Sequence, residues 1–426
     1  MQRREFVKWI STAAAAATLP GCATSLPNKQ KSVARVAIIG AGFAGVAVAK
    51  YLRLWSPDIE VVLIDPNIEF VSRPLSNRVL AGSLDIADLT RSYDALIGKY
   101  GVRMVRDQVT RVDMEKRRVL PSRGGAIPFD RLVVAPGIDL MYESISGVHF
   151  ADAPDYVPHG WVAGRQTTIL REQLEAMPDG GTYALSIPQA PYSCLPAPYE
   201  RACQIAHYFK RNKPKAKVLV LDANENIAFL PTLFARAWEE LYPGMVEYRP
   251  NMRLVEVDVR ELTARFQSGA EIKANVLNVI PPQAAAGIAR DLRLLGISDR
   301  WCEVDFRTYE SIRIKGIHVV GDAVMGPPTM LKTAHVANQQ AKICAAALIA
   351  ILHGDPYRPT PVLTDACYSF VSDKEAIHWT AVYQYDSGKK TMVMMPESAG
   401  TSTVHNAEEA RHASSWLLNI LDDTLG

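Results

Sequence analysis

The chain has 426 residues, of which 48% are hydrophobic and 22% are charged, and its formal net charge is +2. This length predicts two or three domains with a large core, and the composition is that of an ordinary soluble globular protein. The small net charge argues against a nucleic-acid binder, because such proteins carry a marked basic excess. After the first 25 residues, no apolar run approaches the roughly 20 residues that span a bilayer.

The first 25 residues predict an export signal. Arg3 and Arg4 precede an apolar, alanine-rich stretch, which is typical of a bacterial twin-arginine signal. Such a signal is not part of the folded domains, so the fold is predicted without it. An ordinary amphipathic helix is the alternative interpretation. The letters LPGC at 19–22 also resemble a lipoprotein cleavage box, in which Cys22 would become the lipidated first residue. The expected location is the periplasm, in a soluble or lipid-anchored form.

A complete dinucleotide-binding motif follows. The apolar run at 33–39 predicts a buried strand, 46–54 predicts a helix, and the three glycines of a GxGxxG motif lie between them. A second apolar strand ends at Asp65, 20 residues after the last glycine. The glycines permit a tight turn and the approach of the backbone to a pyrophosphate, and the acid would accept hydrogen bonds from the adenosine ribose. The cofactor contacts expected from this unit are Gly40, Gly42, Phe43, Ala44, Gly45 and Asp65.

Two later segments indicate which dinucleotide binds. Residues 129–137 predict a strand with a small-residue turn that contains Ala135 and Gly137, and residues 317–323 predict an apolar strand that closes on Gly321 and Asp322. Nicotinamide dehydrogenases need no such late return to the first domain. The chain here resembles the flavoprotein disulfide reductase superfamily, in which FAD runs across the domain and an acid at such a strand end meets the ribityl chain. The resemblance therefore implies FAD, with Asp322 as the ribityl contact.

The middle of the chain predicts a second nucleotide-type domain without its phosphate loop. A strand at 182–187, a helix at 198–210 and a strand within 216–223 have the expected order. The loop between the first strand and the helix has no glycine and contains several prolines, which offer no amide proton. We therefore expect this domain to have lost its nucleotide, so that electrons enter from another donor. Cys194 lies in this loop.

The predicted fold class is α/β, with two Rossmann-like dinucleotide-binding domains and a C-terminal α+β domain. The expected segments are the export signal at 1–25, the first part of the FAD-binding domain at 33–150, the degenerate second domain at 151–275, the return segment of the FAD-binding domain at 276–353 and a C-terminal domain that caps the flavin at 354–426.

Four short stretches make the resemblance narrower. They are PYSCLPAPYERA at 191–202, NVIPPQ at 278–283, HVVGDA at 318–323 and ACYS at 366–369. Together they closely resemble the flavoprotein subunit of flavocytochrome c sulfide dehydrogenase, a family related to the sulfide:quinone reductases. The resemblance implies that Cys194 and Cys367 form a redox-active disulfide beside FAD, and that Glu200 relays the proton of hydrosulfide. Glu200 is equally well explained as an acid that the first turn of a helix favours.

The other cysteines have simpler explanations. Cys203 and Cys344 fall in helical patterns and Cys302 follows a tryptophan, so all three are expected in the core. The sequence contains no CxxCH motif, so the chain attaches no c-type haem of its own, and the c-type cytochrome that the resemblance implies is a separate partner. No histidine, cysteine or carboxylate cluster has the spacing of metal ligands.

One position departs from the family pattern. Characterised members tether FAD through a cysteine in the segment that corresponds to FVSRPLSN at 70–77, where this chain has Arg73 and no cysteine. We therefore expect FAD to be bound without a covalent bond, with Arg73 paired to a cofactor phosphate or solvated. The helix that begins near residue 333 is expected to point its N-terminus at the flavin, and Lys332 before it is expected to add positive charge there. A lysine at the surface is an equally good interpretation of Lys332.

Three alternatives to a sulfide dehydrogenase remain open. A sulfide:quinone reductase would need an apolar face in the C-terminal region to reach quinone. A disulfide reductase that uses NAD(P)H is disfavoured by the missing second glycine loop. A flavin-loaded binding or assembly module without turnover of its own is disfavoured by the intact pair Cys194 and Cys367.

Overall fold

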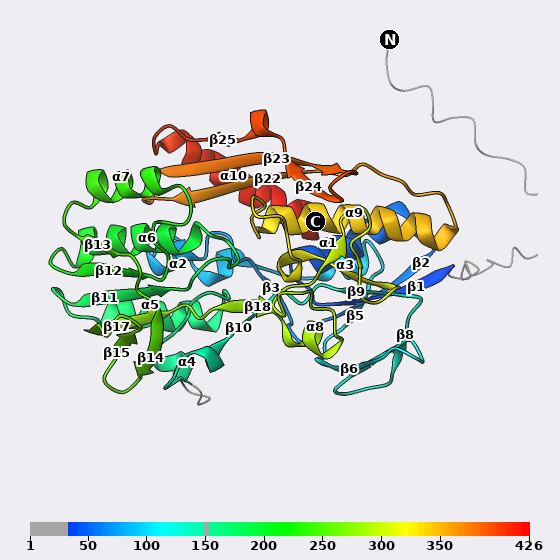
Figure 1. Cartoon of the computed structure of the whole chain (residues 1–426), viewed down its shortest axis with the longest axis horizontal. Coiled ribbons are helices and arrows are strands. Elements are labelled where there is room, and N and C mark those ends of the chain that lie inside the picture. Colours follow the sequence, from blue (N-terminus) through cyan, green and yellow to red (C-terminus); the bar gives the residue numbers. More distant parts are fainter. Residues whose placement is uncertain (1–32, 149–152) are drawn as a thin grey trace, which may run out of the picture. The chain divides into compact units, whose positions relative to one another are not determined.

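The glycine motif follows β1 (Ala34–Ile39), an inner strand of a seven-stranded sheet (Figure 1). Five parallel strands form its body and two antiparallel strands extend one edge. In spatial order the strands are β5 (Arg103–Val105), β2 (Ile59–Ile64), β1 (Ala34–Ile39), β9 (Arg131–Val134), β21 (Ile317–Val319), β20 (Glu310–Ser311) and β19 (Val304–Asp305). The late strand β21 pairs with β9, so the chain returns to the sheet that contains β1.

Two long helices pack against each other on this sheet. Helix α1 (Phe43–Trp55) starts directly after the glycine turn, and α9 (Ala334–His353) follows the return strand. Gly40 has a φ of +98°, and a Cβ atom on Gly45 would lie 1.8 Å from the Gly40 carbonyl oxygen. Both positions therefore require glycine, the first for its backbone angle and the second because the helix passes so close to the strand end.

The inserted domain has its own four-stranded parallel sheet, in the order β13 (Val246–Arg249), β12 (Lys217–Asp222), β11 (Thr182–Ile187) and β17 (Val276–Val279). Helices α5 (Arg165–Ala176), α6 (Ala197–Asn212) and α7 (Pro231–Leu241) accompany it, and a smaller antiparallel sheet contains β14 (Leu254–Asp258), β15 (Thr263–Phe266) and β16 (Glu271–Lys273). Strand β17 still belongs to the inserted sheet, so that sheet extends past the boundary at 275 that the sequence predicts.

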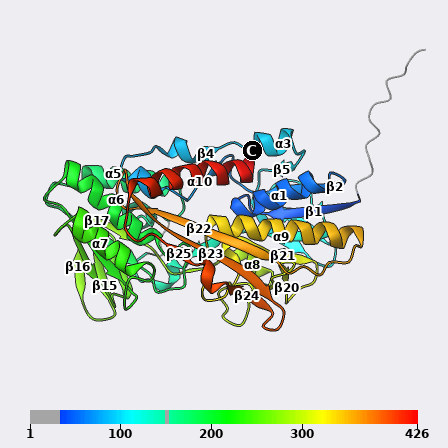
Figure 2. The ribbon, with the colours of Figure 1, turned by 90° about the horizontal axis from the view of Figure 1, so that it is seen from above.

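The C-terminal domain is an antiparallel layer with one helix. It consists of β22 (Val362–Phe370), β23 (Ala376–Asp386), β24 (Thr391–Met394), β25 (Gly400–Thr401) and α10 (Ala407–Leu425). Figures 1 and 2 show this layer running over both nucleotide-type domains. Strand β22 packs against α9 of the first domain and α6 of the second, and α10 packs against α1. The layer thus covers the junction between the two domains.

Shorter elements complete the connections. They are β3 (Phe70–Val71) paired with β4 (Thr90–Arg91), the ribbon β6 (Val109–Asp113), β7 (Arg118–Pro121) and β8 (Ile127–Pro128), the linking pair β10 (Ile138–Leu140) and β18 (Gln283–Ala285), the helices α2 (Asn77–Leu80), α3 (Asp94–Gly98), α4 (Ala153–Tyr156) and α8 (Gly287–Asp291), and four single 3-10 turns at 86–89, 142–144, 321–323 and 396–398.

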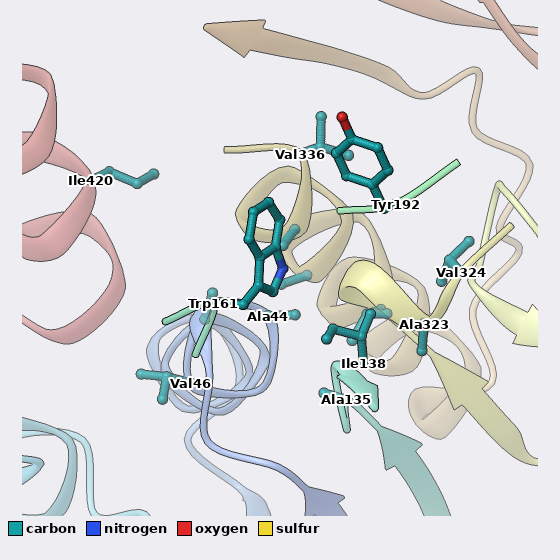
Figure 3. Close-up of a cluster of buried hydrophobic side chains, with 14 of the residues drawn as sticks. Ala44, Val46, Ala135, Ile138, Trp161, Tyr192, Ala323, Val324, Val336 and Ile420 are labelled. Atoms are coloured by element: carbon teal, nitrogen blue, oxygen red, sulfur yellow. The ribbon is translucent and has the colours of Figure 1, made fainter. Parts of the chain in front are cut away.

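A buried apolar cluster extends across the domain junction (Figure 3). Trp161 and Tyr192 come from segments of the inserted domain, and their rings meet edge to face with centroids 6.1 Å apart. Ala44, Ala135 and Val336 of the first domain belong to the same cluster. Burying aromatic rings at this junction stabilises the relative placement of the two sheets.

The computed structural model describes residues 33–148 and 153–426. The predicted twin-arginine signal with Arg3 and Arg4, and the cleavage-box residue Cys22, lie outside the described residues. Within the described ranges, no helix is both long enough and apolar enough to cross a membrane.

Candidate functional site

A cavity of about 380 Å³ joins the glycine motif of the first domain to the two cysteines that the sequence singles out. All predicted site residues line it except Gly45, which packs against Gly40 instead. The predicted residues in its wall are Gly40, Gly42, Phe43, Ala44, Asp65, Arg73, Ala135, Gly137, Cys194, Glu200, Gly321, Asp322, Lys332 and Cys367. Residues from distant parts of the chain therefore converge on one continuous space.

The glycine end of the cavity fits a pyrophosphate. Gly42 is open toward it, since a Cβ atom there would meet nothing within 4 Å, and the first turn of α1 follows with its free amides. Asp65 Oδ2 accepts a hydrogen bond of 2.7 Å from the Ala41 amide, which fixes the turn. Asp65 itself lines the cavity, where a ribose hydroxyl would lie in a dinucleotide fold. These residues fit the adenosine diphosphate half of FAD.

The other end of the cavity is bounded by the N-terminus of α9. Thr333 caps this helix by accepting a 3.1 Å hydrogen bond from the Val336 amide. Lys332 is buried, and its Nζ donates to the carbonyl oxygens of Asp322 (3.0 Å) and Val324. Burial lowers the pKa of Lys332 to about 8. A helix N-terminus and an adjacent cation favour negative charge at this end, where the flavin of FAD would accumulate it on reduction.

Arg73 lies in the cavity wall as part of this end. Its Nη1 is 3.5 Å from Oδ2 of Asp322, the acid for which the sequence predicts a ribityl contact. The side chain is about one-third exposed, so the ion pair is partly screened. The expected contact of Arg73 with a cofactor phosphate stays a prediction.

The structure brings the two predicted catalytic cysteines together. Cys194 lies in the proline-rich loop before α6, and Cys367 lies in β22 of the C-terminal layer. Both are free thiols in this structure, both line the cavity, and the neighbouring Cys194 is the largest cause of the raised pKa of Cys367. The disulfide that the sequence analysis expects is therefore not formed here, although its two partners are in contact. The remaining described cysteines, Cys203, Cys302 and Cys344, are buried, as expected.

The loop that carries Cys194 is held from several sides. Cys194 has a φ of +53°, a left-handed conformation that costs a non-glycine residue of order 1 kcal/mol or more. Its amide donates to the Lys332 carbonyl oxygen at 2.9 Å. The neighbouring Ser193 donates to Gln283 Oε1 through both its amide and its hydroxyl, at 2.9 Å each, and accepts from the Trp161 indole at 3.0 Å. These buried contacts keep the sulfur at the cavity wall.

Glu200 links three parts of the fold beside the thiols. Its Oε2 accepts from Asn77 Nδ2 at 2.7 Å, and its Oε1 accepts from the Phe370 amide of β22 at 2.8 Å. The side chain is buried, and burial raises its pKa against the effect of these hydrogen bonds. The pKa of Cys367 is raised by its hydrogen bond with Cys194, by burial and by the nearby carboxylates. Glu200 is thus a carboxyl group poised to hold or release a proton at the thiol pair.

A buried guanidinium stands next to this carboxyl group. Arg201 is 2% exposed, yet its hydrogen bonds go to neutral acceptors, namely Asn77 Oδ1, Asn278 Oδ1 and the carbonyl oxygens of His159 and Gly160. Burial and this cation lower the pKa of His159 to about 3, so His159 is neutral. Arg201 therefore contributes positive charge to the cavity wall.

Several residues that hold the site side chains in place were not identified from the sequence. Asn77, Trp161 and Arg201 were not identified, although Asn77 ends the segment at 70–77 and Arg201 lies in the stretch at 191–202, both of which were compared with the family. Gln283 stood within a stretch that carried the family resemblance, which was the one signal available for it. Nδ1 of His335 accepts a 3.0 Å hydrogen bond from the Ala366 amide beside Cys367.

In the inserted domain, the acid at the end of the second strand is hydrogen-bonded by protein side chains and is not open to a ribose. Asp222 ends β12, as Asp65 follows β2 in the first domain. It is fully buried, and its Oδ2 accepts from the hydroxyls of Tyr199 (2.7 Å) and Tyr248 (3.0 Å). Its Oδ1 accepts from both the amide and the side chain of Asn224. The carboxylate is thus satisfied within its own domain, in agreement with a domain that lacks a phosphate loop.

Three family models match the chain. Residues 34–161 match the pyridine nucleotide-disulphide oxidoreductases, 167–281 match the central part of the sulfide dehydrogenase [flavocytochrome c] flavoprotein chain, and 359–425 match the flavin-binding part of flavocytochrome c sulphide dehydrogenase. A sulfide dehydrogenase flavoprotein chain from Chlorobaculum thiosulfatiphilum is 49% identical over 45 residues, which is 11% of this chain and 94% of that sequence. The chain belongs to the family of flavocytochrome c sulfide dehydrogenase flavoprotein chains.

More distant relatives extend the match. A mitochondrial sulfide:quinone oxidoreductase from Dictyostelium discoideum is 22% identical over 331 residues, covering 76% of this chain and 72% of the relative. The crystal structure of the sulfide:quinone oxidoreductase from Aquifex aeolicus superposes with a TM-score of 0.76 at 17% identity, covering 92% of this chain and 91% of that one, and shares the fold. The chain is accordingly an FAD-dependent oxidoreductase of a sulfide-oxidising family of flavoproteins.

We predict that neither NADH nor NADPH reduces the bound flavin at a useful rate. The inserted domain has prolines in place of the glycine loop, and Asp222 is occupied by tyrosine and asparagine donors. The measurement is the flavin absorbance of the purified protein after anaerobic addition of each nucleotide, with dithionite as the positive control. Rapid bleaching by either nucleotide would favour the NAD(P)H-dependent disulfide reductase instead.

Proposed function

We propose that this protein is a sulfide dehydrogenase that oxidises sulfide at the Cys194–Cys367 pair and passes the electrons through FAD to a separate c-type cytochrome. The observation that carries the proposal is the contact of these two thiols at the wall of the cofactor cavity. They are 173 positions apart in the chain, and both line the same space as Asp322 and the N-terminus of α9.

In the oxidised enzyme, the two sulfurs would form the disulfide. Hydrosulfide attacks one sulfur, the S–S bond breaks, and a persulfide and a thiolate result with no atom lost. The bound FAD supplies the acceptor for the two electrons of this oxidation. The protein holds the pair in place for this step, since the loop of Cys194 is tied to Gln283 through Ser193 and to Lys332 through its own amide.

Glu200 and Arg201 have complementary roles in this proposal. The buried Arg201 guanidinium attracts the hydrosulfide anion, and Glu200 accepts the proton that remains on the sulfur after attack. Because burial raises the pKa of Glu200, its carboxylate is a better base than an exposed one would be. The Phe370 amide holds Glu200 toward the strand that carries Cys367.

A sulfide:quinone reductase is the second candidate. The similarity in fold to the Aquifex aeolicus sulfide:quinone oxidoreductase favours it, and so does the length of the match to the Dictyostelium discoideum relative. The matches to flavocytochrome c flavoprotein models favour a cytochrome acceptor. Sulfide-dependent reduction of a soluble c-type cytochrome, compared with that of a short-chain quinone, distinguishes them. A non-catalytic flavin module is disfavoured by the paired thiols in the cavity.

We predict that Cys194→Ser and Cys367→Ser each abolish the reduction of the flavin by sulfide while FAD stays bound. Neither thiol belongs to the glycine cradle, so the cofactor site is retained. The measurement is anaerobic flavin bleaching by sulfide, together with the ratio of flavin to protein. Cys203→Ser is the matched control, because this thiol is buried away from the cavity wall. Bleaching of Cys194→Ser at the parental rate would place the sulfur chemistry elsewhere.

We further propose that FAD is bound without a covalent bond. Among the described residues, the cysteines that line the cavity are Cys194 and Cys367, and Arg73 occupies the position of the family tether. Precipitation of the protein in trichloroacetic acid should release essentially all yellow colour into the supernatant. Colour retained in the pellet after thiol reduction contradicts this proposal.

We also propose export by the twin-arginine route to the periplasm, as soluble or lipid-anchored protein. The support is the pattern of Arg3, Arg4 and the alanine-rich stretch, together with the cleavage-box resemblance at Cys22. Changing both arginines to lysine should leave the protein in the cytoplasm, as judged by fractionation of the host cells. An unchanged periplasmic fraction in the double variant argues against this route.

A further inference from the structure

A buried carboxyl group lies close to Cys367 in the same strand, and it has no role in the mechanism proposed above. Asp365 lies two positions before Cys367 in β22 and is 1% exposed. Side chains two apart in a strand point to the same side, about 7 Å apart along the chain. Asp365 and Cys367 therefore share the face of β22 that packs on α9 and α6.

The hydrogen bonds of Asp365 are incomplete on one side. Its Oδ1 accepts from the Thr333 hydroxyl at 2.7 Å, while its Oδ2 has no hydrogen-bond partner among the residues that the structure describes. The Thr333 oxygen in turn accepts from the Val336 amide, so its single hydrogen is committed to Asp365. A proton on Oδ2 would leave all of these bonds intact. The site thus tolerates both a neutral and an ionised carboxyl group.

Burial favours the neutral form, and it raises the pKa of Asp365 to about 7 despite the opposing effects of the Thr333 hydroxyl and the Ala366 amide. Asp365 therefore changes its charge near neutral pH. Other groups also face this place. They are Glu200 from α6, Cys194 from its loop, His335 from α9 and Tyr383 from β23. His335 uses its Nδ1 to accept from the Ala366 amide, so that nitrogen carries no proton.

The two sulfurs of the pair differ in the groups that surround them. Cys367 is near two carboxyl groups, Asp365 and Glu200. Cys194 lies three positions before the first residue of α6, and its carbonyl oxygen accepts from the Ala197 amide at 3.0 Å. Nearby carboxylates disfavour a thiolate, and they contribute to the raised pKa of Cys367.

We propose that Asp365 is a positioning residue for the thiol pair: its ionised carboxyl group disfavours charge on Cys367, so that Cys194 carries the negative charge of the reduced pair. This inference rests on the proposed function of the two cysteines and assigns them different roles. The thiol of lower pKa is the better leaving group. Hydrosulfide then attacks Cys367, which takes up the persulfide, and the broken S–S bond leaves its electron pair on Cys194 as the thiolate.

The test is the rate at which iodoacetamide alkylates each thiol of the reduced holoenzyme, followed for Cys194 and Cys367 separately by peptide mass spectrometry. Only the thiolate reacts, so the logarithm of the rate follows its ionisation between about pH 5.5 and about pH 9.5. Cys194 should react faster than Cys367 throughout. The plot for Cys367 should show a downward step near pH 7, where Asp365 ionises, of about tenfold relative to the low-pH line.

In Asp365→Asn the step should disappear. Above about pH 8, Cys367 should react about tenfold faster than in the parent. Below about pH 6 the two proteins should agree, because the side chain at position 365 is then neutral in both. Asp222→Asn is the matched control. It removes another buried carboxyl group whose pKa is raised by burial, but one that is not among the groups that raise the pKa of Cys367, so the step should remain. Glu200→Gln should retain the step as well.

Three results would overturn the inference. They are a parental profile without a step, a step that survives in Asp365→Asn, and alkylation of Cys367 ahead of Cys194. The parental profile decides the matter even if Asp365→Asn fails to fold, which its flavin content would reveal. None of these measurements uses sulfide. If Cys194→Ser is still bleached by sulfide, the proposed function fails while the alkylation profile stands, so the two failures are distinguishable.

Discussion

One hydrogen bond sets the geometry on which the rest of the site depends, namely that from the Phe370 amide to Glu200. It ties the strand that carries Cys367 to the helix that follows Cys194, across two domains. Glu200 is buried, so leaving it without this donor would cost on the order of 1–3 kcal/mol or more. The same carboxyl group accepts from Asn77 of the first domain. A single side chain therefore coordinates all three parts of the fold at the point where the two thiols meet.

Basic and acidic groups lie at different parts of the cavity wall. Lys332, Arg201 and the N-terminus of α9 bring positive charge to the wall, and Asp365 and Glu200 bring carboxyl groups to the side of Cys367. Burial lowers the pKa of the lysine and raises those of both acids, so each group is shifted toward its neutral form. A shift toward the neutral form reduces the uncompensated charge that is buried at the cavity wall.

The inserted domain illustrates how a nucleotide fold is put to a new use. Its strand order and helices are retained, but the turn that would bind phosphate holds a cysteine in a left-handed conformation. The acid at the end of β12 no longer has a free lone pair toward a ligand, because two tyrosines and an asparagine satisfy it. What the domain contributes is a rigid frame for Cys194, tied to Gln283 and Trp161 through Ser193.

The sequence by itself determined the first dinucleotide fold, because a GxGxxG turn between a buried strand and a helix is a local arrangement that glycine alone permits. It also indicated that the second phosphate loop was lost, since proline removes amide protons wherever it stands. It could not place Asn77, Arg201 or Asp365, which are ordinary polar residues in their local sequence. Only the tertiary structure decided their roles, because burial and a partner from a distant segment give a polar side chain its shifted pKa and its fixed direction. The pairing of Cys194 with Cys367 has the same origin, since 173 positions of intervening chain separate two sulfurs that only the packing of β22 on α6 brings into contact.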